Sequence, residues 1–140
     1  MGKTHHTISR FLFYDLAAAH RKLHVSLNNR LKELDVQVET WRVLETLSSD
    51  EALTMGELAE IVLMNPPTLT KLVDRMVANG LVHRQLAPED HRRVHLVLTN
   101  VGLELIGKVR RHVEAQHEDI LERLGEENAR IVQQALRTLS

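Results

Sequence analysis

Five basic residues in the middle of the chain have the type and spacing to bind a polyanion. They are Lys71, Arg75, Arg84, Arg92 and Arg93. The same stretch holds three acidic residues, and one of them, Asp90, lies two positions before Arg92. The 140-residue chain has a formal net charge of −1, so any affinity for nucleic acid must come from a local patch of this kind. Guanidinium and ammonium groups bind phosphate, which makes nucleic acid the first ligand to consider.

The segment that precedes these cations predicts two short helices joined by a turn. Thr54 and Glu57 have the spacing of a capping box, which predicts a helix over residues 55–62. Asn65 is then the next N-cap, followed by a proline at the first helical position, where the missing N–H costs least. The second helix is predicted over residues 66–78.

A hairpin is predicted after the second helix. Gly80 suits a left-handed cap at the helix end, and two short strands are predicted over residues 81–86 and 94–98 with a charged turn between them. Helix, turn, helix and hairpin in this order are the plan of a winged helix-turn-helix domain. In that plan one helix enters the DNA major groove and the hairpin reaches the backbone or the minor groove. We predict a mainly α fold with a small β-hairpin wing, and a DNA-binding lobe over residues 36–99.

The predicted helix over residues 66–78 has one apolar and one polar side. Its apolar side carries Leu69, Leu72, Val73 and Met76. The end and the side that would meet DNA carry Pro66, Thr68, Thr70, Lys71 and Arg75. We predict that the two threonines contact bases or phosphate, and that the two cations bind phosphate or guanine. The alternative for Arg75 is an ion pair with Asp74 or with a core-facing acid, away from DNA.

Amphipathic helices are predicted on both sides of the lobe, in residues 1–35 and 100–140. Apolar residues at steps of three and four predict a long helix over residues 8–34. A helix over residues 38–47 follows it, and Gly125 separates a second long helix, 100–124, from a last short one. This second long helix carries the apolar residues Val101, Leu105, Val109, Val113, Ile120 and Leu124.

These flanking helices need a surface to cover their apolar sides, and the lobe is small. A symmetric dimer in which they interdigitate is the predicted solution. The alternative is that they fold back on their own lobe. In either case the chain is expected to form one domain over residues 1–140.

Composition excludes several classes of function. There is no cysteine, which excludes disulfides and thiolate chemistry. No apolar run approaches the ~18 residues of a membrane span, and the N-terminus lacks the apolar core of a secretion signal. We therefore expect a cytoplasmic protein that does not enter a membrane. No nucleophile elbow, phosphate loop or paired-carboxylate pattern is visible, so an enzyme is not expected, and neither is a cofactor.

Three segments resemble the DNA-binding core of the MarR family of bacterial transcriptional regulators. They are WRVLETL, TLTKLVDRMVANGLVHR and PEDHRRVHLVLTNVG. The resemblance implies a homodimer that binds pseudo-palindromic operators and, in most members, repression that a small effector relieves. Two features depart from the family pattern. The Asn65-Pro66-Pro67 entry is stiffer and less polar than usual, and the absence of cysteine excludes the thiol-based peroxide sensors.

The wing is predicted to contact DNA through an arginine. An aspartate two residues from an arginine can orient a guanidinium toward a narrow minor groove. The family likeness supports Asp90 as this brace, and Arg92 or Arg93 as the inserted or phosphate-contacting group. The alternative is a solvated charged turn. A further alternative for the whole lobe is a winged helix that docks a protein and has no operator, although so many cations argue against it.

The resemblance also implies an effector pocket between the dimer helices and the DNA-binding lobe. The matching positions are Phe11, Tyr14, His20, His24, Trp41 and Arg42. An aromatic carboxylate or an acyl thioester would suit such a lining, while the alternative is that the aromatic residues serve core or dimer packing. His20 and His24, with His112 and His117 on another helix, raise the possibility of a zinc site. The five-residue spacing of the second pair fits one helical face poorly, so no metal is expected.

Overall fold

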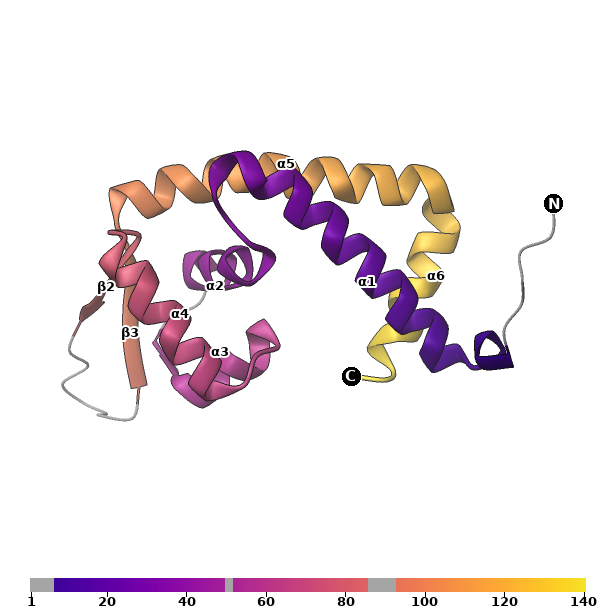
Figure 1. The fold of residues 1–140 in the computed structure, drawn as a ribbon, viewed down its shortest axis with the longest axis horizontal. Helices are drawn as coiled ribbons and strands as arrows, with labels where there is room; N and C mark the ends of the chain where they lie inside the picture. The colour runs from indigo at the N-terminus through magenta and orange to yellow at the C-terminus, as the bar shows by residue number, and fades with distance from the viewer. Residues whose placement is uncertain (1–6, 50–51, 86–92) are drawn as a thin grey trace. The chain divides into compact units, whose positions relative to one another are not determined.

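The structure, a computed structural model, describes residues 7–49, 52–85 and 93–140. Over these ranges it is mostly helical with one small antiparallel sheet (Figure 1), as the sequence predicts. The chain divides into two compact units, one that ends at Val38 and one from Glu39 to Ser140. Each unit is described by itself.

The first unit is built on one long helix. The α1 helix covers Leu12–Leu31, with a short 3-10 helix on each side, η1 at Thr7–Arg10 and η2 at Lys32–Leu34. The prediction of one helix over residues 8–34 is therefore correct in its middle and wrong at both ends. Phe11 is extended where η1 meets α1, and Asp35 takes a left-handed conformation (φ 55°) that ends η2.

The α2 helix covers Val38–Ser49, and all of it but Val38 belongs to the second unit. The helix-turn-helix follows it. The α3 helix covers Met55–Val62 and α4 covers Pro66–Ala78, so both lie at their predicted bounds. The reason is local, because each helix has its own cap. Thr54 Oγ1 accepts from the Glu57 N–H at 3.0 Å, and the Asn65 side chain accepts from the Thr68 N–H at 3.0 Å.

The sheet is the base of the wing. It has the order β1-β3-β2, with β1 at Leu53–Thr54, β2 at Val82–Gln85 and β3 at Arg93–Leu98, all antiparallel. The two predicted strands are confirmed, and β1 was not predicted, since two residues are too few for an alternating pattern. Gly80, with φ 73°, turns the chain from α4 toward β2, as expected.

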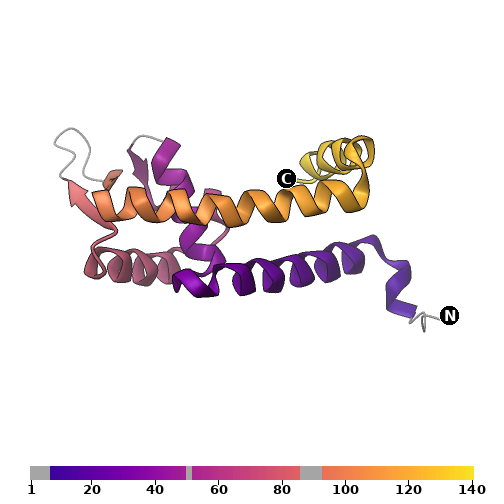
Figure 2. The same cartoon turned by 90° about the horizontal axis from the view of Figure 1, so that it is seen from above.

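The C-terminal part of the second unit consists of α5, Asn100–Leu124, and α6, Glu126–Arg137 (Figure 2). Both follow the predicted pattern, with Gly125 between them at φ 83°. None of the helices in the described ranges is long and apolar enough to cross a membrane.

The apolar side chains of α5 differ in their exposure within one chain. Val101 is 56% exposed, whereas Gly102, Ile106 and Val109 are buried. The cause is a close approach to Leu81, whose carbonyl oxygen accepts from the Thr99 N–H at 3.0 Å. A Cβ at Gly102 would overlap that oxygen, so the helix must turn this glycine toward Leu81. This contact fixes how the start of α5 is rotated about its own axis.

The apolar side of α4 lies in the core as predicted. Leu69, Leu72, Val73 and Met76 are all at least 94% buried, together with Leu58 of α3 and Leu44 of α2. Four buried side chains on one 13-residue helix hold its axis firmly, so its other side is presented on a rigid support.

Candidate nucleic-acid interface

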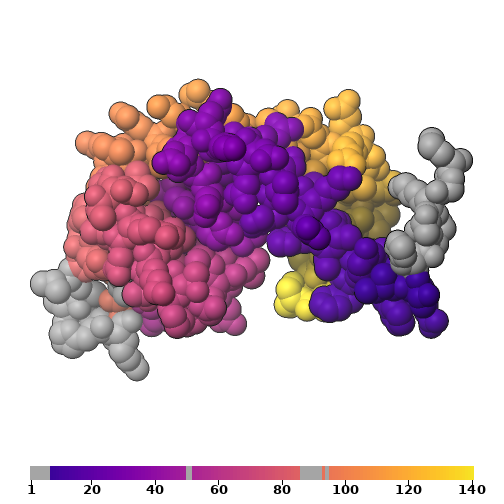
Figure 3. Space-filling model, viewed as in Figure 1, coloured from indigo at the N-terminus to yellow at the C-terminus, as the bar shows by residue number. Residues whose placement is uncertain are grey.

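The outer side of α4 carries the residues that the sequence singled out for DNA. Pro66, Thr68, Thr70, Lys71 and Arg75 are all exposed. Together with β2, α4 forms part of the rose-coloured surface of the second unit in Figure 3. The Thr70 hydroxyl donates to the Pro66 carbonyl at 3.0 Å, so it can accept a further hydrogen bond without losing its own.

Two cations on this surface are not neutralised within the part of the chain that the structure describes. Neither the Lys71 side chain nor the Arg75 side chain makes a hydrogen bond or an ion pair to any described residue. The two lie four positions apart on α4 and so share a face. The alternative in which Arg75 pairs with Asp74 is not what the described residues form, because Asp74 binds a different cation.

That cation is Arg84, on β2. Its Nη2 donates to Asp74 Oδ1 at 2.5 Å, and both side chains remain about half exposed. The strand places Arg84 on the side of the sheet that meets α4, while its neighbours His83 and Gln85 contact each other on the other side, 3.3 Å apart. A predicted DNA-binding arginine thus lies against the outer face of α4, held by an acid of that helix.

The predicted wing tip lies outside the described residues. This holds for Asp90 and Arg92, whose predicted roles stay predictions. Arg93 is described, and it starts β3. Its Nη1 donates to Glu57 Oε1 at 3.0 Å and to the Ala52 carbonyl at 3.3 Å. The arginine therefore fastens the base of the wing to the first turn of α3.

Glu57 has two partners in this arrangement. Its carboxylate also accepts from the Thr54 N–H at 3.3 Å, which completes the capping box. The hydrogen bonds from Thr54, and then the positive charge of Arg93, hold the pKa of the Glu57 carboxyl below its ordinary value. The sequence pattern identified Glu57 as a cap, but its pairing with Arg93 depends on the β1–β3 register, which no local signal marks.

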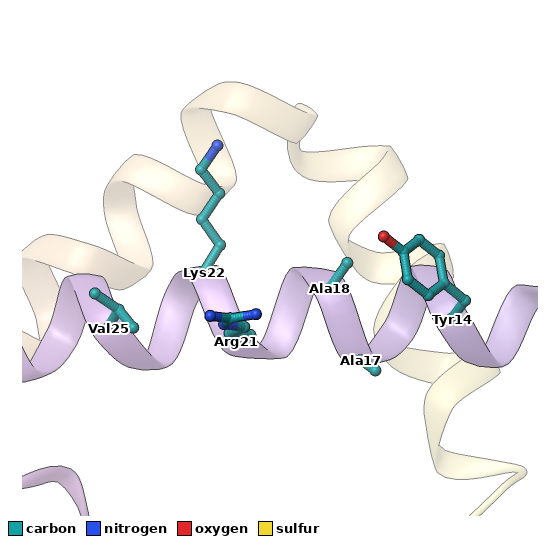
Figure 4. Close-up of a pocket in the computed structure, with 6 residues that line it drawn as sticks. All are labelled: Tyr14, Ala17, Ala18, Arg21, Lys22 and Val25. Atoms are coloured by element: carbon teal, nitrogen blue, oxygen red, sulfur yellow. The ribbon is translucent and has the colours of Figure 1, made fainter. Parts of the chain in front are cut away.

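The candidate effector residues fall in both units. In the first unit, Phe11 is 53% exposed with the Arg10 guanidinium 4.9 Å from its ring centre, and the rings of His20 and His24 are 5.4 Å apart. Tyr14 lines a hollow of about 480 Å³ along α1 (Figure 4). The other lining residues are Ala17, Ala18, Arg21, Lys22 and Val25. Tyr14 is the one predicted effector residue among them.

In the second unit, Trp41 belongs to a polar cluster that joins α2 to α5. Its indole N–H donates to Glu45 Oε1 at 3.3 Å. Arg110 of α5 donates to the same carboxylate through Nε, at 3.0 and 3.2 Å, and through Nη2, at 2.7 Å. These bonds, chiefly the one from Arg110, lower the pKa of Glu45. Arg42 contributes its carbonyl to the Thr46 hydroxyl at 2.8 Å. Sequence reasoning missed Glu45 and Arg110, which lie 65 positions apart.

The histidines do not gather into a metal site in the ranges that the structure covers. No group of three or more His, Asp or Glu side chains is close enough there to hold an ion.

Comparison with known proteins decides the family. A family profile described as MarR family matches residues 34–93. The HTH-type transcriptional regulator ML2140 of Mycobacterium leprae is 32% identical over 110 residues, which are 79% of this chain and 75% of that protein. The solved structure of the MarR family transcriptional regulator SPO1453 from Silicibacter pomeroyi is 30% identical, with a TM-score of 0.82 over 96% of both chains. The chain belongs to the MarR family.

Another relative and two solved structures extend the comparison. The transcriptional repressor IacR of Pseudomonas putida is 34% identical over 99 residues, which are 71% of this chain but only 59% of IacR's own length. NadR, solved in complex with 4-hydroxyphenylacetate, is 27% identical with a TM-score of 0.78, over 99% of this chain and 96% of NadR. CouR, solved on a 23-mer DNA duplex, is 23% identical with a TM-score of 0.87 over 99% of both chains, a likeness of fold. The MarR-family chain is thus a transcriptional regulator with a winged DNA-binding lobe, and not an enzyme.

Proposed function

We propose that this MarR-family regulator binds a pseudo-palindromic DNA operator as a homodimer and represses transcription until a small effector releases it. One observation carries the DNA-binding part. The α4 helix has a fully buried apolar side and an outer side on which Lys71 and Arg75 are unneutralised among the described residues. A rigid helix that presents free cations suits the major groove.

In this proposal the position of each residue along α4 decides which part of the DNA it contacts. Pro66, Thr68 and Thr70, near the N-terminal end, approach base edges or the nearest phosphates, and Lys71 and Arg75 bind phosphate or guanine. The prolines remove two N–H donors from this end, so base recognition depends on few side chains.

The wing provides the second contact of the proposal. Arg92, in the predicted tip, would be the group that reaches the minor groove or its phosphates, with Asp90 as its brace. Arg93, whose guanidinium is already bound to Glu57, acts as the anchor that sets the direction of the wing, and touches phosphate only if that ion pair opens. The protein would work in the cytoplasm, where bacterial DNA lies.

The dimer is supported by exposed apolar side chains in both flanking regions, residues 1–35 and 100–140. Phe13 is 82% exposed and Leu12 68% in the first of them, and Leu139 is 71% exposed in the second. Ile8, Phe11, Ile131, Val132 and Leu136 are also between 41% and 53% exposed. Apolar surface of this extent is typical of helices that a second copy covers.

The effector part is supported by the relatives. NadR was solved with an aromatic carboxylate, and IacR is named a repressor. We propose an aromatic carboxylate, or alternatively an acyl thioester, as the effector, with Phe11, Tyr14, His20, His24, Trp41 and Arg42 as its candidate contacts. Binding would change the separation of the two recognition helices, which must match half-sites about 34–36 Å apart.

Selection from a random pool of DNA duplexes tests this function. We expect recovered sequences with two inverted half-sites whose centres are about 10 base pairs apart, bound by a dimer in sedimentation at the same protein concentration. Recovery of no common sequence would contradict the proposal and favour a winged helix that docks a protein. Adding 4-hydroxyphenylacetate to the selected complex then tests the effector class, and unchanged affinity would exclude that ligand.

A further inference from the structure

Asp74 is an acidic residue on the outer side of α4, among the cations Lys71, Arg75 and Arg84. It is the one acidic residue of α4, three positions after Lys71 and next to Arg75. Its carboxylate is on Arg84 of β2, at 2.5 Å, with side chains that are 58% and 48% exposed. An ion pair this exposed contributes little to stability, so folding alone gives a weak reason for a negative charge at this position.

The pair changes how the surface attracts DNA. Non-specific binding comes almost entirely from cations that replace the counterions of phosphates, and each such contact adds about 0.9 to the slope of log K against log salt. Arg84 brings no net charge to a phosphate while Asp74 holds it, and Asp74 repels phosphates that approach Lys71 or Arg75. Both effects weaken binding to DNA of any sequence.

The same ion pair lowers the affinity for an operator less than the affinity for other DNA. There the guanidinium must take one fixed position, and the hydrogen bond from Arg84 to Asp74 already holds it in one. Without Asp74 the arginine side chain would be free in the unbound protein and would lose that freedom on binding. Removal of Asp74 would therefore have two opposing effects on operator affinity. It would free the charge of Arg84, and it would add the entropic cost of ordering the Arg84 side chain.

We propose that Asp74 is a specificity-determining residue of the DNA-binding surface, because its pairing with Arg84 suppresses non-specific DNA binding more than operator binding. The proposal rests on the proposed function. Asp74 would act by weakening binding to the wrong DNA, whereas its neighbours Lys71 and Arg75 would act by strengthening binding.

The test compares Asp74→Asn with wild-type protein on a duplex selected from a random pool and on a scrambled duplex of equal length. At 0.1 M salt, one additional phosphate contact raises non-specific affinity by roughly 8-fold. We expect Asp74→Asn to bind the scrambled duplex 5- to 10-fold more tightly, with a salt slope steeper by about 0.9. Operator affinity should change by less than 2-fold, so the preference for the operator falls 5- to 10-fold. An equal gain on both duplexes, or no gain on scrambled DNA, would overturn the proposal.

Three further variants locate the effect. Glu104→Gln makes the same change of net charge at an exposed position on a different helix, α5, and should leave the preference unchanged. Asp74→Glu keeps the charge and should stay within 2-fold of wild type on both duplexes. In an Arg84→Gln background, Asp74→Asn should lose most of its effect. If the effect persists there at full size, or if Glu104→Gln reproduces it, Asp74 does not act through Arg84.

Different results would contradict operator binding and the role of Asp74. Wild-type protein that prefers no selected duplex over scrambled DNA refutes the proposed function. A clear wild-type preference that Asp74→Asn leaves intact refutes only the role of Asp74. Far-UV circular dichroism of each variant confirms that the compared proteins are folded.

Discussion

The ion pair between Glu45 of α2 and Arg110 of α5 should stabilise the contact between these two helices by a small, measurable amount. The guanidinium donates three bonds of 2.7 to 3.2 Å to one carboxylate and a fourth, of 2.7 Å, to the Ser48 hydroxyl. Forked arginine–carboxylate pairs are among the stronger ones. The Arg110 side chain is 41% exposed and the Glu45 side chain 38%, however, so water screens the charges and most of the Coulomb energy is lost. We expect a coupling free energy of about 1 kcal/mol, at the upper end for exposed pairs.

A double-mutant cycle measures this coupling. Glu45→Gln keeps an oxygen that can accept from the Trp41 indole, and Arg110→Met keeps the apolar stem of the arginine. The free energy of unfolding is measured in urea for wild type, both single variants and the double variant. Far-UV circular dichroism is the suitable signal, because the indole of Trp41 contacts Glu45 and its fluorescence would report the local change. Protein concentration must be equal throughout, since the stability of a dimer depends on it.

Additive effects of the two substitutions would contradict this coupling. If the losses of the two single variants sum to that of the double variant within about 0.3 kcal/mol, the forked pair contributes nothing beyond its separate groups. A real pair should also weaken in 1 M NaCl, where the screening length falls to about 3 Å. A coupling energy that salt leaves unchanged would point to packing and not to charge.

Three further predictions concern residues 39–140. The pKa values of Glu45 and Glu57 are both lowered by folding, so their contribution is complete at neutral pH and is lost as pH falls through the lowered values, below about pH 4.3. Urea midpoints at pH 7 and pH 3.5 should therefore differ less for Glu45→Gln than for wild type, and an equal difference would contradict the assignment. Gly102→Ala should lose about 1–3 kcal/mol in thermal unfolding, because its Cβ would overlap a backbone carbonyl, while Gly107→Ala, with open space around it, should lose nothing. Arg92→Ala should weaken operator binding by about 1–3 kcal/mol and flatten its salt dependence, and a folded variant with unchanged affinity and slope would remove the wing from the proposal.

The parts of the fold that the sequence predicts well are those governed by neighbouring residues. The bounds of α3 and α4 follow from caps at Thr54 and Asn65, and a cap needs only three or four residues to be recognised. The buried side of α4 follows from helical periodicity for the same reason. The end of α5 is likewise set by one local residue, Gly125.

The parts that the sequence did not predict depend on residues far apart in the chain. The rotation of α5 is set by Gly102 against Leu81, and β1 exists only through its pairing with β3. The ion pairs of the site join positions 10, 36 and 65 residues apart. Among thirty-seven charged residues no pattern indicates such partners, because any cation could meet any anion until the fold places them. The pair of Asp74 with Arg84, on which specificity is proposed to depend, belongs to this class.

Operator recognition is tested by a fluorescence-anisotropy titration of the purified protein against the selected duplex and a scrambled one, at 50 mM and 200 mM salt. We expect tighter binding to the selected duplex at both salts, and a loss of affinity of at least 10-fold between them, as is typical of a surface that neutralises several phosphates. Equal affinity for the two duplexes, or binding that salt does not weaken, would contradict the claim that the outer face of α4 and the wing recognise an operator.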